Sequence, residues 1–275
     1  MTTPDTRRRR ARLGLFLLAT VLAALTVFPL LWMVTGAFKG PGEVGGTNLL
    51  PQSPTLDNFD YVFTQVPFLR YLLNSFFVSA VVTVIALFFH SMAAYALARL
   101  RFPGRDRIFL FIFATLLITF PAVLVPLFVI VRELGMLNSY AGLIVPAIFN
   151  AFGIFLLRQF YITLPTELEE AAKIDGAGYW RIYFSVILPL SRPIMSALAV
   201  FFFLANWNSF IWPLVITGDQ ELNVVQLGIA SFQQQYSGKW EYVITAAAVA
   251  AVPTMLLFVF FQRQIVESIK TAGIK

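Results

Sequence analysis

The sequence predicts an all-α membrane protein with six transmembrane helices, and three observations lead to this fold class. Hydrophobic residues make up 59% of the 275 residues and charged residues only 12%, whereas a soluble domain has roughly 25% charged residues. The apolar residues lie in long runs, and Lys and Arg gather in alternate loops between them. A water-exposed enzyme is strongly disfavoured, because the polar residues are too few to cover its surface.

The six predicted spans follow from run length. A spanning helix needs about 20 apolar residues to cross a hydrocarbon core of roughly 30 Å. No qualifying segment contains Asp or Glu, and the one full charge, Arg158, lies near a segment end, where its long side chain can reach the interface. The predicted spans are Leu13–Val34, Asn74–Leu97, Ile108–Val131, Ala141–Phe160, Ile194–Ile216 and Val243–Phe261.

The first segment could instead be a cleaved signal peptide, because arginines precede it. A signal peptide has an apolar region of about 7–15 residues. This run has 22 residues, contains Pro29 and Trp32, and lacks a convincing small-residue cleavage site. We therefore predict that it is a transmembrane helix.

The distribution of cations between loops predicts the orientation. One side carries 16 of the 20 Lys and Arg residues and the other side 4, while the 14 acidic residues divide equally. Cytoplasmic loops are the ones enriched in Lys and Arg, so both termini are predicted to be cytoplasmic. The cytoplasmic cations are Arg7–Arg10, Arg12, Arg99, Arg101, Arg105, Arg107, Arg158, Lys173, Arg181, Arg192, Arg263, Lys270 and Lys275; the external ones are Lys39, Arg70, Arg132 and Lys239.

Several chemistries are disfavoured by the residues that the chain lacks. It contains no Cys and a single His, so we expect no disulfide and no metal site. It has no G-x-x-x-x-G-K-[ST] phosphate loop. Its spans lack the carboxylates that proton- or sodium-coupled transporters usually keep in the membrane. We therefore expect no catalytic residue on this chain.

Polar residues within the spans are the remaining candidates for function. His90 is an ionisable group in the second span, and we favour a structural role in which it stays neutral and bonds a neighbouring helix. Unpaired amides are costly in hydrocarbon, so the densest cluster, Asn206, Trp207 and Asn208, either joins helices or lines a possible translocation path.

The loop between the fourth and fifth predicted spans has strong helix signals. Thr166 with Glu169 matches a capping box, and Gly176 suits a left-handed stop. A second helix is predicted from about Gly178 to Leu188, ended by Pro189. The loop, residues 164–193, therefore contains a short capped helix on the cytoplasmic side.

The segment EAAKIDGAGYWRIYFSVILP resembles the EAA loop of bacterial binding-protein-dependent ABC importer permeases. The spacing of the family pattern is kept throughout, with Val186 where Ile is commoner. Three further stretches, Ala93–Asp106, Asn206–Leu214 and Phe260–Lys275, resemble permeases similar to the second membrane subunit of maltose-type sugar importers. The residues that match the loop pattern or lie within it are Glu170, Ala171, Ala172, Asp175, Gly176, Leu188 and Pro189.

This resemblance implies a type I-like ABC importer permease bundle, residues 13–262, with a cytoplasmic coupling helix and cytoplasmic tails at 1–12 and 263–275. The implied partners are a second, homologous permease, a homodimeric ABC ATPase that carries ATP and Mg, and an extracytoplasmic sugar-binding protein that meets loop 217–242. The implied location is the plasma (inner) membrane of a prokaryote, with membrane lipid around it and no nucleic acid partner. A permease for a non-sugar solute and an ATPase-independent facilitator stay open as alternatives.

Overall fold

The computed structural model describes the backbone of residues 4–235 and 239–272, and every regular element in those ranges is helical. Side chains are described for residues 12–233 and 239–262. Arg7–Arg10 and the tail 263–275, which support the predicted orientation, lie outside the described side chains.

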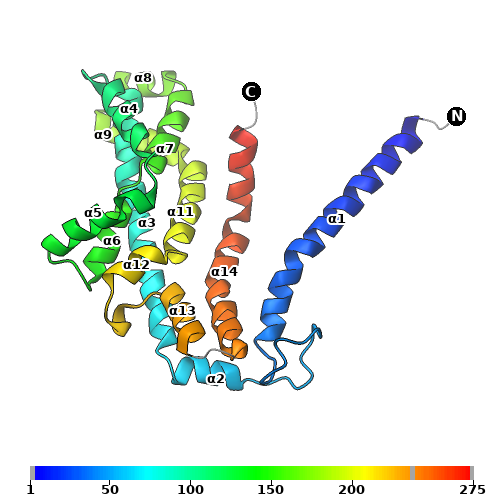
Figure 1. Cartoon of the computed structure of the whole chain (residues 1–275). Helices are drawn as coiled ribbons and strands as arrows, with labels where there is room; N and C mark the ends of the chain where they lie inside the picture. The colour runs from blue at the N-terminus through cyan, green and yellow to red at the C-terminus, as the bar shows by residue number, and fades with distance from the viewer. Residues whose placement is uncertain (1–3, 236–238, 273–275) are drawn as a thin grey trace. The chain divides into compact units, whose positions relative to one another are not determined.

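Figure 1 shows the helices in chain order. They are α1 (Pro4–Gly36), α2 (Asp57–Thr64), α3 (Phe68–Arg99), α4 (Arg105–Thr115), α5 (Phe120–Glu133), α6 (Tyr140–Ile148), α7 (Ala151–Thr163), α8 (Glu167–Ile174), α9 (Tyr179–Ile182), a π-helix (Tyr183–Ile187), α10 (Leu188–Leu190), α11 (Arg192–Trp207), α12 (Ile211–Ile216), a 3₁₀-helix (Gln220–Leu222), α13 (Val225–Gln235) and α14 (Trp240–Ala272).

The chain divides into two compact units, which are described separately. Unit 1 comprises residues 1–68 and 229–251, and unit 2 comprises residues 69–228 and 252–275. The whole predicted cytoplasmic loop 164–193 and the second to fifth predicted spans belong to unit 2.

Among the residues that the structure describes, four helical segments are long and apolar enough to cross a membrane, and they correspond to the first, second, fourth and sixth predicted spans. Two bent helix pairs raise the number to as many as six. The four segments are Arg12–Gly36, Phe68–Arg99, Tyr140–Thr163 and Trp240–Gln262.

The third and fifth predicted spans are not continuous helices in the structure. The third is divided into α4 and α5, which meet at 100°, and Pro121 stands in the first turn of α5. In the fifth, the helix breaks after Trp207 and resumes as α12, which contains Pro213. Proline has no N–H to donate to the preceding turn, and this favours a break before each second helix.

Two apolar clusters of unit 2 lie along α3. Val78 and Val82 pack with Leu143 and Trp212, whereas Ala86, Ala94 and Tyr95 lie in the other cluster. That second cluster also contains Leu157, Tyr161, Ile182, Tyr183, Ile187, Leu198 and Phe202. Because side chains four residues apart lie on one helix face, α3 serves as the common support for α6, α7, α9 and α11.

His90 has the structural surroundings that the sequence predicted. It is 3% exposed, and its Nε2 accepts a hydrogen bond from the backbone N–H of Asn150, 3.4 Å away, at the junction of α6 and α7. A Cβ added to Gly153 would lie 2.5 Å from Nδ1 of His90 and 2.7 Å from the ring of Phe202. Gly153 therefore allows α7 to approach α3 and α11 closely.

The predicted outer loop 35–73 contains ordered structure in unit 1. Lys39 is 1% exposed; its ammonium donates to the Asn48 carbonyl at 2.6 Å and lies 4.3 Å from the centre of the Trp32 ring. The Asn58 amide donates to the carbonyls of Ala37 and Lys39 at 3.0 and 2.8 Å. These bonds order the chain between α1 and α2.

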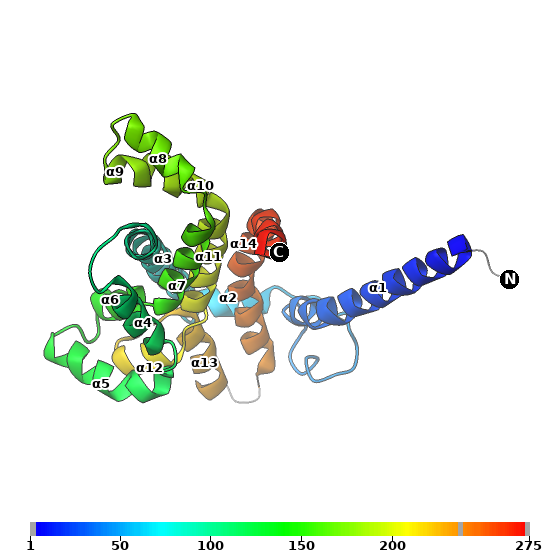
Figure 2. The same cartoon turned by 90° about the horizontal axis from the view of Figure 1, so that it is seen from above.

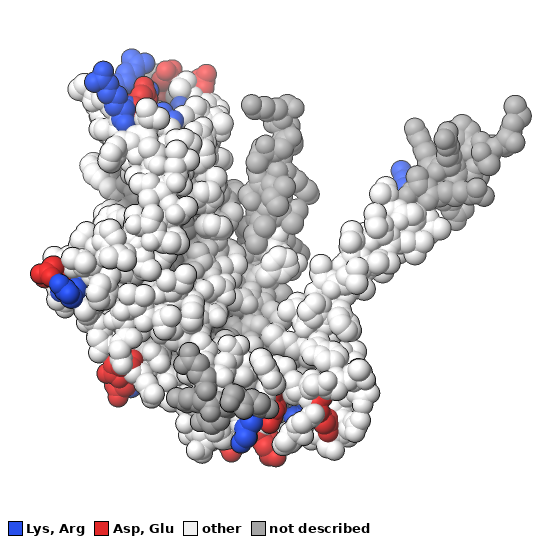
Figure 3. Space-filling view, viewed as in Figure 1, with Lys and Arg blue, Asp and Glu red and all other residues white. Residues whose placement is uncertain are grey.

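Charged atoms of unit 2 gather at the end where α8, α9 and the start of α4 lie, with an uncharged surface next to them (Figures 1 and 3). Figure 2 shows α8 and α9 as a pair that projects beyond the helices around α3. This charged end coincides with the loops for which the sequence predicts a cytoplasmic location.

Candidate functional site

The short helix of the predicted loop is α8, and it begins where the sequence places it. Its predicted capping box is wrong: Thr166 has helical dihedral angles and makes no side-chain cap, while Glu169 pairs with Arg99 instead. The first turn does carry Glu167, Glu169 and Glu170, which the positive end of the helix dipole stabilises.

The predicted left-handed stop of α8 is confirmed at Gly176, whose φ is +77°. The N–H of Gly176 donates to the Lys173 carbonyl at 3.0 Å, and the N–H of Ala177 donates to the Ala172 carbonyl at 2.9 Å. This pair of bonds is the Schellman motif, in which a glycine satisfies the last carbonyls of a helix. The end of α8 is therefore sharply defined.

The second predicted helix begins as expected with α9 but does not end at Pro189. The chain continues through the π-helix and α10, and it bends by 75° between Leu190 and Arg192. In a π-helix each N–H donates to the carbonyl five residues earlier. The hydrogen-bond pattern of the helix therefore changes just before Pro189, which has no N–H to donate. Leu188 packs against the core cluster and Pro189 is half-buried.

A buried ion pair attaches α8 to the end of α3. Nε of Arg99 lies 2.8 Å from Oε1 of Glu169, and the two side chains are 8% and 9% exposed. Nη2 of Arg99 also donates to the carbonyls of Leu164, at 2.6 Å, and Pro165, at 3.4 Å. Sequence reasoning counted Arg99 only as one of the cytoplasmic cations and assigned Glu169 to a cap, because their contact joins residues 70 positions apart.

The other face of α8 is exposed. Glu170, Ala171, Asp175 and Gly176 face solvent in this chain, whereas Ala172 is half-buried against the core cluster. Ile174 is 87% exposed, so its apolar side chain adds to the open surface on this side of α8. Sequence reasoning overlooked Ile174, although an isolated isoleucine among charged residues was a signal.

Two aromatic residues extend this exposed surface. Tyr179 and Trp180 at the start of α9 are 62% and 64% exposed. They border a largely apolar cavity of about 320 Å³, which is also lined by Met92, Tyr95, Ala96, Leu100 and Tyr183. Exposed apolar surface next to a charged helix is typical of a protein–protein contact.

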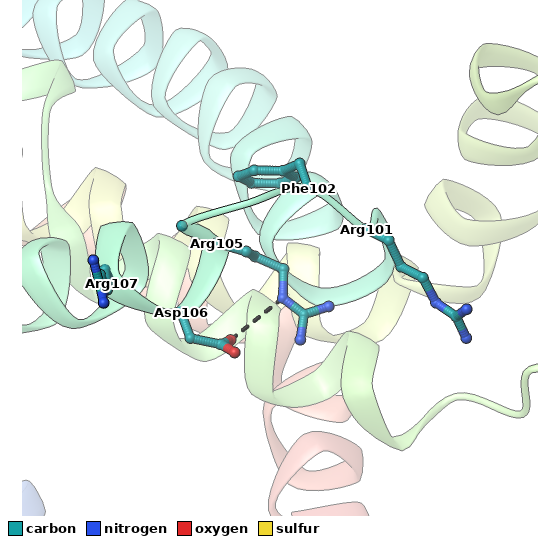
Figure 4. Close-up of a pocket in the computed structure, with 6 residues that line it drawn as sticks. Arg101, Phe102, Arg105, Asp106 and Arg107 are labelled. Carbon is teal, nitrogen blue, oxygen red and sulfur yellow. Dashed lines mark hydrogen bonds and ion pairs between the residues drawn. The ribbon is translucent and has the colours of Figure 1, made fainter.

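The loop between α3 and α4 forms a basic, open cavity of about 660 Å³. Figure 4 shows Arg105 and Asp106 directed toward each other, while Arg101 and Arg107 point to opposite sides. Nε of Arg105 lies 3.3 Å from Oδ1 of Asp106, and Nη2 of Arg158 lies at the same distance from that oxygen.

Arg158, which we predicted to reach the interface from the end of its span, is held by several contacts at that end. Its Nε donates to the Leu97 carbonyl at 3.2 Å, and its guanidinium lies 3.8 Å from the centre of the Phe109 ring. With Asp106 as an ion-pair partner, the only charge within the six predicted spans is held against α3 and α4.

The candidate path residues lie where α11 breaks. The side-chain amides of Asn206 and Asn208 donate to the carbonyls of Phe202 and Leu204 in the preceding turn, at 2.8 and 2.9 Å. Trp207 is 1% exposed, whereas Asn208 is exposed and accepts a bond from Gln226 at 3.2 Å. Asn206 borders a small cavity with Ser209, and the path assignment stays a prediction.

The opposite end of α3 carries a polar network. The Asn74 amide donates to the carbonyls of Glu221 and Asn223, both at 2.9 Å, and the Tyr140 hydroxyl donates to Oδ1 of Asn74 at 2.7 Å. Arg70 forms an exposed ion pair with Glu221 at 2.9 Å. The first part of loop 217–242 is thereby held to α3; residues 236–238 of that loop lie outside the described residues.

Comparison with known proteins identifies a family and several relatives of this chain. Residues 90–271 match the family described as "Binding-protein-dependent transport system inner membrane component". The chain is 35% identical over 259 residues to the arabinooligosaccharides transport system permease protein AraQ of Halalkalibacterium halodurans, which covers 92% of this chain and 93% of that protein.

Two other relatives and one solved structure agree. Identity is 32% to the lactose transport system permease protein LacG of Rhizobium radiobacter, over 95% of this chain and 96% of that one. Identity is 37% to the diacetylchitobiose uptake system permease protein NgcG of Streptomyces coelicolor, over 90% of this chain and 83% of that one. A bacterial ABC transporter that imports the acidic polysaccharide alginate contains a chain with the same fold, with a TM-score of 0.81 at 22% identity over 96% of this chain and 98% of that chain.

Proposed function

Because the chain belongs to the family of binding-protein-dependent transport system inner membrane components, we propose that it is a permease subunit of an ATP-driven sugar importer. The observation that carries the proposal is similarity along nearly the whole chain to permeases named for arabinooligosaccharides, lactose and diacetylchitobiose. The class of transported solute is therefore a sugar or oligosaccharide.

The assembly that we propose has four kinds of subunit. This permease pairs with a second, homologous permease, both bind a homodimeric ABC ATPase, and an extracytoplasmic sugar-binding protein delivers the solute. ATP and Mg would bind the ATPase, so this chain itself carries no cofactor. The apolar window of the first span, none of which is buried within this chain, offers a surface for membrane lipid and for the second permease.

Within that assembly, the exposed face of α8 would be the coupling surface. Glu170, Ala171, Asp175 and Gly176 would enter a cleft of the ATPase beside Ile174, whose 87% exposure within this chain supports a partner there. Small side chains allow a close approach, and a carboxylate offers a charge-assisted bond to an arginine or a backbone amide. Ala172, Leu188 and Pro189 would hold this helix pair against the core.

The membrane topology that we propose follows from the distribution of Lys and Arg between the loops. Residues 1–12 and 263–275 would be cytoplasmic tails, residues 13–262 the transmembrane permease domain and residues 164–193 its cytoplasmic loop. The membrane would be the plasma (inner) membrane of a prokaryote. Asn206 and Asn208 would face the solute path near the break in α11, where amide groups can bond sugar hydroxyls.

Two measurements test the proposal. Purification in mild detergents should yield a second permease and an ATPase in a ratio of about 1:1:2, the stoichiometry that the proposed assembly requires. Proteoliposomes that contain the complex and its binding protein should then accumulate labelled oligosaccharide only when ATP is present. A chain that purifies alone and equilibrates sugar without ATP would favour the facilitator, and uptake of only a non-sugar solute would favour the other alternative.

A further inference from the structure

The ion pair between Arg99 and Glu169 differs from the other ion pairs among the described residues. Both of its side chains are at most 9% exposed, whereas in each of the other four pairs one partner is at least 66% exposed. Exposed pairs contribute little to stability. When a pair is buried away from water, the attraction between its charges is screened far less. That stronger attraction holds the two side chains in place more firmly.

Arg99 joins the end of α3 to a stretch of chain 65 to 70 residues later. Arg99 is the last residue of α3, Glu169 lies on α8, and the carbonyls of Leu164 and Pro165 that also accept from Arg99 lie between α7 and α8. The planar guanidinium can donate in several directions at once. Arg99 therefore constrains both the position and the direction in which α8 leaves α7.

The inner face of α8 continues the same contact. Ala172, three residues after Glu169, packs against the core cluster that contains Tyr95, and Tyr95 lies one helical turn before Arg99. Residues three or four apart share a face of a helix. Glu169 of α8 thus pairs with Arg99, while Ala172 packs against an apolar cluster to which α3 contributes Tyr95.

Stability alone does not account for this arrangement. A buried ion pair is often no more stabilising than apolar residues of the same volume, although removal of one partner leaves a costly unpaired charge. What Arg99 supplies is a buried charge attraction to Glu169, together with directional hydrogen bonds to the Leu164 and Pro165 carbonyls, and apolar packing has neither. Apart from these contacts of Arg99, α8 is joined to the bundle by the packing of Ala172 against the core cluster and by the chain links 164–166 and 175–178.

We infer that Arg99 and Glu169 form a rigid link that makes the end of α3 move together with α8. Motion imposed on α8 then enters the bundle directly through α3, in addition to the covalent routes through α7 and α9. This inference rests on the proposed function, because it assumes that a partner moves α8. Arg99 and Glu169 are positioning residues: they act through α8 and α3, and neither is required to touch the solute.

The test compares single and paired substitutions in the reconstituted complex. Arg99→Met and Glu169→Gln should each lower sugar uptake per ATP hydrolysed by about 2- to 30-fold, the range expected for residues that carry coupling between sites. Because either single variant leaves a buried polar group unpaired and could fail to fold, Arg99→Met with Glu169→Met supplies an apolar pair that preserves burial. We expect this paired variant to assemble and hydrolyse ATP but to remain poorly coupled.

Two control variants separate the link from a general loss of charge. Arg132→Met and Glu133→Gln each break an exposed ion pair, whose side chains are 56% and 67% exposed, far from α8. Both should keep the wild-type uptake per ATP. An assembled paired variant with wild-type uptake per ATP would overturn the inference and leave the pair with a packing role only.

A distance measurement tests the link without any transport readout. The chain has no Cys, so spin labels can be attached at Lys173→Cys on α8 and Arg101→Cys just after α3. The distance between the labels should stay constant between the nucleotide-free and ATP-trapped complex, and its distribution should broaden in the paired variant. A change of about 5 Å, one helical turn, in the otherwise wild-type complex would refute a rigid link.

The two proposals fail in different ways. A wild-type complex without ATP-dependent sugar uptake would refute the proposed function, while the label distance would still report whether α3 and α8 move together. ATP-dependent uptake that is unaffected in the paired variant would refute only the link.

Discussion

Substitutions at Gly176 test whether a sharply defined end of α8 is needed for coupling. Gly176 has φ +77°, and an added Cβ would meet nothing within 4 Å, so the effect of a substitution comes from the backbone alone. An L-residue in the left-handed region costs about 1–2 kcal/mol, less for Asn. Proline, with φ fixed near −65° and no N–H, costs about 3 kcal/mol or more and removes the bond to Lys173.

These costs translate into a graded expectation. A penalty of about 1–2 kcal/mol multiplies the unwound fraction of the last turn by roughly 5 to 30. Amide hydrogen exchange over this turn should therefore accelerate in the order Asn, Ala, Pro, and ATP-dependent uptake should fall in the same order. The complex should still assemble, because Gly176 is exposed and lies outside the apolar clusters.

Gly178→Ala is the matched control for this series. Gly178 is exposed and has an ordinary φ of −74°, and an added Cβ would also meet nothing within 4 Å. Its substitution should change stability by no more than about 0.5 kcal/mol and leave both exchange and uptake unchanged. Equal behaviour of Gly176→Ala and Gly178→Ala would refute the argument that the left-handed stop matters.

Three further predictions concern other positions. Glu170→Ala should leave the exposed helix folded but abolish ATP-linked uptake, and wild-type uptake in the reconstituted complex would contradict its coupling role. Gly153→Ala should destabilise the chain by about 1–3 kcal/mol through overpacking, because its Cβ would lie 2.5 Å from a buried imidazole; Gly14→Ala, with nothing within 4 Å, should not lower the melting temperature. Asn74→Ala should lower the free energy of unfolding by on the order of 2–4 kcal/mol, because it leaves two carbonyls and the Tyr140 hydroxyl without their partner. Thermal unfolding in detergent measures this effect, and an unchanged melting temperature would show that these bonds contribute nothing.

Helix ends were predictable where the local sequence determines the dihedral angles. Gly176 stops α8 as predicted, because the left-handed conformation is a property of one residue and its two neighbours. Thr166 and Pro189 behaved differently from the prediction. Glu169 found a cation from another helix, and a change to π-helical register allowed the helix to pass through Pro189; both outcomes depend on tertiary partners that local sequence does not reveal.

The breaks within the third and fifth predicted spans show the same limit. Neither segment contains a charged residue and both are long enough to cross a membrane, so run length alone predicted one helix for each. Pro121 and Pro213 were visible in the sequence, but Pro29 and Pro253 lie inside helices that continue. Whether a proline breaks a helix depends on whether neighbouring groups satisfy the freed carbonyls.

The all-helical membrane class, the apolar segments and the stop of the short loop helix at Gly176 could be predicted from the sequence, because composition, run length and single-residue dihedral preferences are local properties. Which charges meet depends on the tertiary structure. It paired Arg99 with Glu169, held Arg158 against Asp106, and buried Trp207 while leaving Ile174 exposed. Contacts of this kind join residues separated by tens of positions, and helix packing in three dimensions selects them.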